Sequence, residues 1–289
     1  ALAAFGVTTA LDMGTWPPEL VAALRQADGV TDIRSVGSSA AGPGGVHARI
    51  PGFPADGILT SPDQARAYVK ARVAEAVDYI KVIVEAPGHG GLDETTLRTV
   101  VEEAHAHGRI VIAHASATGA IALAQAAGAD VLTHAPLDAP IGESAIAQMV
   151  HACRIIVPTL VMMEGVVRNG ARPGIDYGNA RDTVTALHSA GVPIVVGTDA
   201  NNSPGVPANV PHGAGLHREL ELLVDAGLTP TEALCGATGL SARCFGLPDR
   251  GRVQAGLRAD LLLVGGDPTH EITATRDIRA VWIAGRKVG

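Results

Sequence analysis

The sequence predicts an α/β fold: a parallel (β/α)8 TIM barrel followed by a small β-sandwich appendage. Two observations lead to this prediction. Short apolar segments alternate with helical patterns seven times before residue 246, and such alternation gives a parallel sheet with helices outside it. After that point the pattern changes to short β segments separated by glycines, at 252–257, 259–264 and 278–288. We therefore predict two domains, 1–245 and 246–289.

The predicted strands of the barrel are apolar runs bounded by turn residues. They lie at 7–13, 33–38, 79–85, 110–116, 131–136, 155–161 and 194–200. Pro158 falls inside one of them and predicts a local break in strand pairing, because proline has no N–H to donate. Residues 40–59 form a long loop rich in Gly, Pro and Ala, a length more typical of a functional loop than of a simple connection.

Helices are predicted between these strands from capping residues and apolar spacing. Ser61 followed by Pro62 is a typical helix start, with an N-cap hydroxyl and proline in the first turn. The predicted helices span 17–26, 61–77, 92–107, 118–127, 141–152, 177–190, 212–226 and 230–243.

The first residues, 1–6, resemble the last turn of a helix that ends at Gly6. Seven strands are one fewer than a closed barrel needs. We therefore expect the visible strands to be strands two to eight, with strand one and part of the appendage upstream, so that the fold is incomplete at the N-terminus. The sequence begins with Ala and carries no information on a signal peptide.

Composition restricts the class of function. A hydrophobic fraction of 47% supports a sizeable core. The net charge of −7 argues against a nucleic-acid partner, and no apolar run reaches the roughly 18 residues of a membrane span. Cys153, Cys235 and Cys244 have no C-x-x-C spacing, which favours reduced core thiols over disulfides or metal ligands. We expect a cytoplasmic homo-oligomer that acts on a small-molecule substrate.

Four polar residues stand at or near the carboxyl ends of predicted strands: Lys81, His114, His134 and Asp199. Buried strands rarely contain such residues without partners, and barrel strands end together at the face where active sites lie. Imidazole and carboxylate groups suit Zn²⁺ or another divalent first-row ion. Burial beside cations lowers the pKa of a lysine, and its neutral amine can then take up CO₂ as a metal-bridging carbamate. The four residues therefore predict a site for two metal ions.

In such a site, two metal ions activate a water molecule and polarise a carbonyl group. Asp199 is then both a ligand and the general base that passes the proton to the leaving nitrogen. Six further residues are candidates for substrate contact. His47 and His89 lie in glycine-rich loops, and Arg172 and Tyr177 could clamp a carboxylate. His212 and His217 open the helix predicted at 212–226, where a solvated face is an equal alternative.

The motifs around these four residues are Tyr-Ile-Lys-Val at 79–82, Ala-His-Ala at 113–115, Thr-His-Ala at 133–135 and Gly-Thr-Asp-Ala at 197–200. Together with the tail at 251–264, they resemble the amidohydrolase superfamily across essentially the whole chain. The resemblance is greatest to the branch of imidazolonepropionase-like enzymes and Xaa-Pro dipeptidases. It implies a metal-dependent hydrolase that cleaves a C–N bond in an amide, peptide, urea or cyclic amide.

One family motif is absent. Members carry a His-x-His pair at the end of the first strand, and this sequence has none there. His105 and His107 have that spacing, but we expect them at a helix end, interacting with the helix dipole. We expect the pair upstream of residue 1. The alternative is a non-catalytic scaffold or fragment of the same fold, with a remnant metal site.

Overall fold

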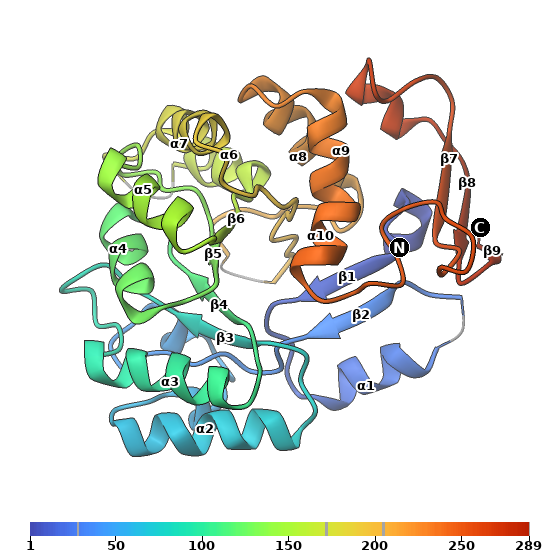
Figure 1. Ribbon diagram of the computed structural model, residues 1–289. Helices are drawn as coiled ribbons and strands as arrows, with labels where there is room; N and C mark the ends of the chain where they lie inside the picture. The colour runs from blue at the N-terminus through green and yellow to red at the C-terminus, as the bar shows by residue number, and fades with distance from the viewer. Residues whose placement is uncertain (28, 171–172, 204–205, 289) are drawn as a thin grey trace.

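Parallel strands follow one another around the centre of the molecule, and helices cover their outer side (Figure 1). The structure is a computed structural model that describes residues 1–27, 29–170, 173–203 and 206–288. Strands β1 and β2 pair in parallel, and β3 to β6 form a parallel sheet in sequence order. These strands are β1 Thr9–Asp12, β2 Asp32–Ser35, β3 Ile80–Ile83, β4 Val111–His114, β5 Val131–Thr133 and β6 Ile155–Val157.

Two isolated bridges extend this arrangement into one arc. Ala40, beyond the end of β2, pairs with Val82 of β3, and Ile194 pairs with Ile156 of β6. The predicted α/β class with a parallel sheet is therefore confirmed. Within the described residues, no backbone hydrogen bond joins the segment 194–200 to β1, so the arc stays open there.

The helices lie close to their predicted positions. They are α1 Glu19–Gln26, α2 Pro62–Ala74, α3 Glu94–Ala106, α4 Thr118–Ala127, α5 Glu143–His151, α6 Leu160–Arg168, α7 Tyr177–Ser189, α8 Ala214–Asp225, α9 Pro230–Ala237 and α10 Gly239–Cys244. Short 3-10 helices are η1 Leu2–Phe5, η2 His47–Arg49, η3 Ala55–Gly57 and η4 Ile272–Arg276. Ser61 caps α2 by accepting a hydrogen bond from the Gln64 N–H at 3.3 Å, as its sequence position predicts.

Three predicted elements of the barrel differ from the structure. The strand at 155–161 ends at Val157, and α6 begins at Leu160 in its place, because Pro158 interrupts the pairing and Thr159 turns the chain with φ 51°. The segment 194–200 pairs only at Ile194. The helix at 230–243 is divided at Thr238, whose φ of −130° is not helical.

Inside the arc, alternate residues of each strand point inward, because side chains of a strand alternate between its two faces. Tyr79, Ile112, Val131 and Val195 form one apolar cluster with Phe245. The Tyr79 hydroxyl donates to the Phe245 carbonyl at 2.9 Å. Two positions further along the same strands stand Lys81, His114 and Thr133. The interior therefore changes from apolar to polar towards the carboxyl ends of the strands.

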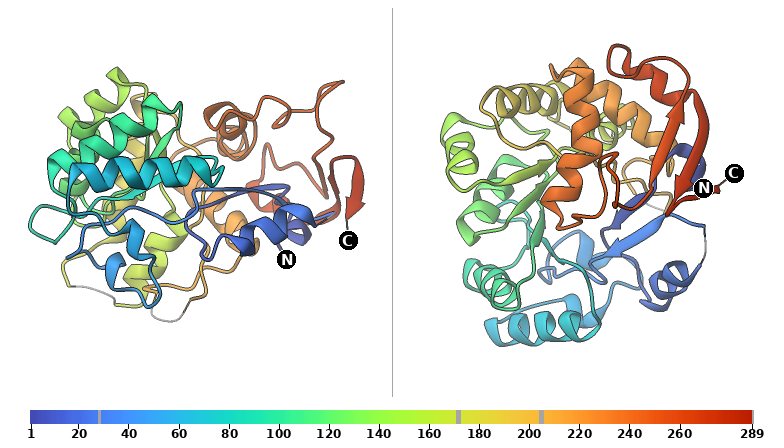
Figure 2. Two further views of the ribbon diagram at one scale, coloured as in Figure 1. Left: turned by 90° about the horizontal axis from the view of Figure 1, so that it is seen from below. Right: turned by 45° about the vertical axis from the view of Figure 1, so that its right-hand side comes forward.

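A three-stranded antiparallel sheet follows the barrel, formed by β7 Leu261–Val264, β8 Ile278–Ile283 and β9 Arg286–Val288. The predicted strand at 252–257 is not found in this fully described segment. The sheet lies beside the N-terminal segment, so that the two chain ends are neighbours (Figure 2). Its Leu262 packs against Gly6.

Buried Arg250 anchors the segment that leads into this sheet. It donates to Thr9 Oγ1 at 2.8 Å and pairs with Asp32 and Asp249. The three cysteines are free thiols, but Cys153 and Cys235 are exposed, so their predicted place in the core is wrong. None of the helices in the described ranges is both long enough and apolar enough to cross a membrane.

Candidate functional site

Two imidazoles meet at the carboxyl ends of β4 and β5. His114 is the last residue of β4, and His134 follows directly after β5. His134 Nε2 and His114 Nδ1 lie 2.8 Å apart and share a hydrogen bond. The other ring nitrogen of His134, Nδ1, lies 2.7 Å from the Thr159 hydroxyl. Burial lowers the pKa of His134 well below its ordinary value, and the positive charges of Lys81 and His47 add to this effect. His134 is therefore neutral at pH 7, the form in which imidazole binds metal ions.

Lys81 lies on β3 beside this pair and is only 5% exposed. Its Nζ donates to Thr133 Oγ1 at 3.1 Å, and the Thr133 hydroxyl donates in turn to the Ala113 carbonyl at 3.1 Å. Burial lowers the pKa of Lys81 to about 8, although the negative charge of Asp199 opposes the shift. A substantial fraction of the amine is therefore neutral near physiological pH, in contrast to an ordinary lysine.

Asp199, in the segment after Ile194, interacts with the positive charges of Lys81 and His47. Burial raises the pKa of its carboxyl, while the positive charges of Lys81 and His47 lower it. The residue also keeps exposed surface, so it is surrounded by protein and still open to solvent. This combination suits a group that exchanges protons with a bound molecule.

Backbone strain is concentrated at this site. Among the described residues, six non-glycine residues have positive φ, and three of them are His134 at 89°, Thr159 at 51° and Asp199 at 50°. Such conformations persist only where the surrounding structure holds them, and they are frequent at functional sites. For His134 the consequence is geometric. Its predecessor Thr133 already points inward, and the left-handed turn brings His134 to the same side.

His47 joins the histidine pair from the long loop after β2. Its ring centroid lies 4.5 Å from that of His114, which lies 4.5 Å from that of His134. His47 Nδ1 is 3.6 Å from Glu85 Oε1, an oxygen that accepts a hydrogen bond from the Val46 N–H at 3.1 Å.

Closely packed glycines hold this loop against the turn after β3. A Cβ on Gly42 would lie 2.2 Å from the carbonyl carbon of Gly91, and one on Gly90 would lie 2.4 Å from that of Gly44. The Gly44 N–H donates to the Gly90 carbonyl at 3.1 Å. The two loops therefore form one packed unit, which we call the glycine interlock (Gly42, Gly44, Gly90 and Gly91).

The structure gives the other predicted substrate contacts different surroundings. His89 and His212 are exposed, and His89 Nδ1 lies 3.1 Å from the Pro87 carbonyl. His217 is buried, with Nδ1 3.1 Å from Thr275 Oγ1 of η4. The Tyr177 hydroxyl is buried, and its pKa is raised by burial and by the nearby charges of Glu219 and Glu164. Arg172 lies outside the described residues. Of these candidates, the structure brings His47 to the histidine pair, and the roles of the others stay predictions.

A divalent metal ion fits the histidine pair. His114 Nδ1 and His134 Nε2 lie 2.8 Å apart. Two nitrogens bound to one tetrahedral zinc ion would be separated by roughly 3.3 Å. A small outward movement of one ring would therefore open a ligand position. Within the described ranges, no three or more His, Cys, Asp or Glu side chains already form a metal cluster. Of the other two predicted ligands, Lys81 donates to Thr133, the residue before His134, and Asp199 interacts electrostatically with Lys81. The lysine becomes a metal ligand only as a neutral amine or a carbamate.

The sequence prediction missed three residues that support this site: Thr133, Thr159 and Glu219. Glu219 on α8 is fully buried and accepts from the N–H groups of Leu160 at 2.9 Å and Val161 at 2.7 Å. Burial raises its pKa to about 8, against the two hydrogen bonds, which lower it. A glutamate amid apolar helix positions was a signal that could have indicated a buried role. The two threonines have no distinguishing signal beyond their position beside strand ends.

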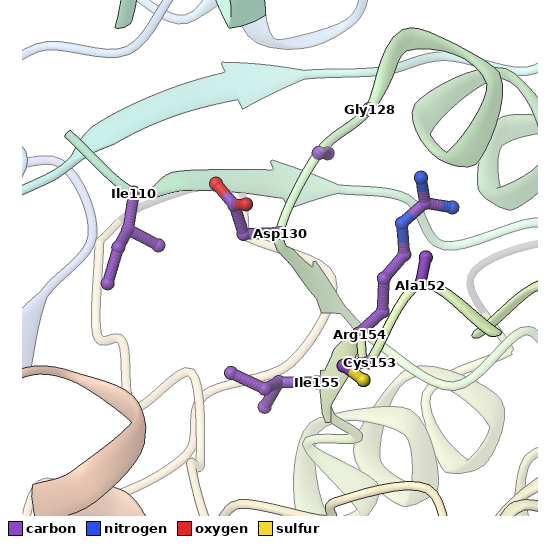
Figure 3. A pocket seen from close by; sticks show the side chains of 8 residues that line it. Ile110, Gly128, Asp130, Ala152, Cys153, Arg154 and Ile155 are labelled. Carbon is purple, nitrogen blue, oxygen red and sulfur yellow. The ribbon is translucent and has the colours of Figure 1, made fainter. Parts of the chain in front are cut away.

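A separate pocket of about 350 Å³ lies at the opposite ends of the same strands, before β4, β5 and β6 (Figure 3). Its polar residues already have partners. Asp130 accepts from the Val111 N–H at 2.7 Å and lies 2.9 Å from His105 Nε2, while Arg154 donates to Gln125. This engagement of His105 confirms that it lies at a helix end, away from the histidine pair.

The fold and the site define an α/β barrel protein with a polar centre at the carboxyl ends of its strands. Residues 1–288 match the Amidohydrolase family, and the chain belongs to this family.

Relatives of known sequence cover parts of the chain. An uncharacterized protein of Mycobacterium tuberculosis is 28% identical over 206 residues, which are 68% of this chain and 52% of that protein. The chain thus spans about half the length of this curated relative. An imidazolonepropionase of Cereibacter sphaeroides is 41% identical over 106 residues, covering 35% of this chain and 25% of that enzyme.

Solved structures match almost the whole fold. A Xaa-Pro dipeptidase with bound methionine in its active site superimposes with a TM-score of 0.83 at 22% identity, covering 99% of this chain and 77% of that one. A putative prolidase from Bifidobacterium longum gives a TM-score of 0.81 at 27% identity, covering 99% and 74%. These similarities confirm the TIM-barrel fold.

Proposed function

We propose that this protein is a metal-dependent hydrolase that cleaves a C–N bond of a small amide, peptide, urea or cyclic amide. The observation that carries the proposal is the contact between His114 Nδ1 and His134 Nε2 at 2.8 Å. It lies at the end of the barrel that also holds Lys81 and Asp199. The names of similar proteins support the bond type, since they include an imidazolonepropionase and a Xaa-Pro dipeptidase, as well as a phenylurea hydrolase at 25% identity and a TM-score of 0.78.

His114, His134, Lys81 and Asp199 would hold two zinc ions, or two other divalent first-row ions. When bound, such ions polarise a carbonyl group and make a water molecule acidic at neutral pH. Lys81 would contribute as a carbamate: its neutral amine attacks CO₂, an N–C bond forms, and one proton leaves to solvent. The lowered pKa of Lys81 favours this reaction.

The chain's own groups then bind the substrate and move the proton. Asp199 would accept the proton of the attacking water and transfer it to the leaving nitrogen. Burial favours the protonated form of the Asp199 carboxyl, and the positive charges of Lys81 and His47 favour its ionised form. His47, beside His114, would contact the substrate from the loop that the glycine interlock holds in place.

Metal content per chain, measured by elemental analysis of protein purified without chelator, is the first test. About two equivalents of a divalent ion are expected. Protein that contains no such ion would contradict the proposal and favour the alternative of a non-catalytic scaffold, consistent with the lack of a ready-made cluster among the described residues.

Turnover of an amide, dipeptide and urea panel is the second test. Asp199→Asn should abolish the hydrolysis that the unaltered protein shows, because an amide cannot accept the proton. Turnover retained by this variant would overturn the role of Asp199. The exposed residue His270 provides a matched control as His270→Ala, because the partners of its side chain in the described part of the chain are its neighbours Asp267 and Thr269.

A further inference from the structure

We propose that Glu219 is a positioning residue for this site, acting through the start of α6 and Thr159 on the orientation of His134. The proposal rests on the proposed function, because it assumes that His134 is a metal ligand. Glu219 itself stands on α8, in a different part of the barrel from β4 and β5.

The first step is the hydrogen bond between Thr159 and His134. A histidine that binds a metal through one ring nitrogen is oriented by the partner of the other. His134 presents Nε2 to His114, and its Nδ1 lies 2.7 Å from Thr159 Oγ1. The Thr159 hydroxyl therefore fixes the ring plane of His134. If Nε2 bound a metal ion, Nδ1 would carry the ring proton and donate it to this hydroxyl.

Thr159 does not cap α6 with its side chain. It occupies the N-cap of α6, where a threonine hydroxyl normally accepts a hydrogen bond from the first turn of the helix. Its side chain makes no such capping bond, because the hydroxyl is directed to His134. The first N–H groups of α6, buried with their residues, need another acceptor.

Glu219 supplies this acceptor. Its two oxygens accept from the N–H groups of Leu160 and Val161 at 2.9 and 2.7 Å, and its side chain is fully buried. A remote carboxyl thus replaces the N-cap hydroxyl and leaves it available to the imidazole. Thr159 itself is a β-branched residue with φ 51° and 3% exposure. Such a conformation needs firm support from its neighbours, and the adjoining first turn of α6 is held by Glu219.

The experiment measures Zn²⁺ affinity of the full chain by competition with a chromophoric chelator, with circular dichroism to verify folding. Thr159→Val should weaken zinc binding about 10- to 100-fold, the range typical of lost ligand-orienting contacts. Thr159→Ser keeps the hydroxyl and should restore binding to within about threefold. Glu219→Gln should weaken binding about tenfold, because an amide offers one acceptor oxygen and cannot satisfy both N–H groups.

Glu232→Gln is the matched control. Glu232 also supports a helix start, accepting from the Thr229 N–H at 2.8 Å in the capping box of α9, but it has no connection to His134. Equal zinc affinities of the Glu219→Gln and Glu232→Gln proteins would overturn the proposal, as would unchanged affinity in Thr159→Val. If Glu219 acts through Thr159, adding Glu219→Gln to Thr159→Val should cause no further loss of affinity, and an additive loss would also overturn it.

Failure of the proposed function and failure of a variant to fold can both be distinguished from failure of the role of Glu219. If the unaltered protein binds no zinc, the proposed function fails before any variant is compared. If Glu219→Gln does not fold, Glu219→Asp takes its place. Its shorter side chain cannot reach both N–H groups, so zinc binding should weaken, and unchanged binding would contradict the role of Glu219.

Discussion

Lys81 and Thr133 are joined by a hydrogen bond of 3.1 Å between Nζ and Oγ1. The Thr133 hydroxyl donates a hydrogen bond to the Ala113 carbonyl, so the two hydrogen bonds together connect the adjacent strands β3, β4 and β5. The bond between Lys81 and Thr133 gives the buried lysine a side-chain acceptor at the polar end of the barrel interior, and it fixes where the amine stands relative to the histidine pair.

Thr133→Val should destabilise the protein by about 1–3 kcal/mol at pH 7, because the ammonium of Lys81 loses this buried acceptor. Urea unfolding followed by circular dichroism measures the loss. Since the pKa of Lys81 is about 8, the difference from the unaltered protein should shrink above that pH, where the amine is neutral. Thr133→Ser keeps the hydroxyl, so its unfolding free energy should decrease much less. Equal losses in the two variants would show that the methyl group, not the hydroxyl, matters.

Gly42→Ala should disrupt the glycine interlock, because its Cβ would lie 2.2 Å from the Gly91 carbonyl carbon. We expect a loss of about 1–3 kcal/mol in unfolding free energy, together with faster proteolytic cleavage in the loop that carries His47. Gly142→Ala is the control, since no heavy atom lies within 4 Å of its added Cβ. Wild-type cleavage of the Gly42→Ala loop would contradict the interlock.

The stability of the protein should decrease as pH rises from about 4.5 to 8 through the titration of Glu219. Its pKa is raised from 4.5 to about 8 in the folded state. The folded protein thus keeps a proton that the unfolded chain has lost, and each unit of this difference is worth on the order of 1.4 kcal/mol. Unfolding free energies of the unaltered protein and Glu219→Gln, compared across this range, isolate the effect. If the unfolding free energies of the two proteins changed with pH in the same way, Glu219 would be ionised in the folded protein and the prediction would be wrong.

Arg250→Ala should lower stability by about 1–3 kcal/mol, because Asp32 and Thr9 lose a buried hydrogen-bond donor while Asp32 keeps its ion pair with Arg34. Arg250 is 6% exposed and joins β1 and β2 to the segment before the C-terminal sheet. Thermal unfolding measures the change. Exposed Arg252, which contacts only Gln254 among the described side chains, is the control, and Arg252→Ala should change stability by less than about 0.5 kcal/mol.

The sequence was sufficient to predict the elements whose signal is local. Apolar runs that contain Lys81 and His114 at or near their carboxyl ends indicated buried strands, and the structure has both strands, with Lys81 inside β3 and His114 at the end of β4. The alternation of side chains also explains why these two residues share the interior. Local patterns failed at 155–161 and 194–200, where Thr159 and Asp199 adopt positive φ. No residue-type preference indicates a left-handed threonine, because the contacts that hold it come from other elements.

The candidate site was likewise predicted only where its residues carry a local signal in the sequence. Lys81, His114 and His134 were predicted from their positions at or near strand ends. The two histidines are in contact, and Lys81 donates a hydrogen bond to Thr133, the residue before His134. The supporting residue Glu219 contacts residues 58 and 59 positions away in the chain, a relationship that one sequence does not contain. Burial of His217 against Thr275 likewise depends on how the C-terminal segment packs on α8.

The glycine interlock also limits how this protein can diversify. Two loops that touch backbone to backbone cannot change length independently, since an insertion in one would displace the other and, with it, His47. We expect descendants and laboratory libraries to tolerate paired changes at 42–45 and 87–91 far better than single ones. Selection for a new substrate would therefore act on the two loops as one inherited unit.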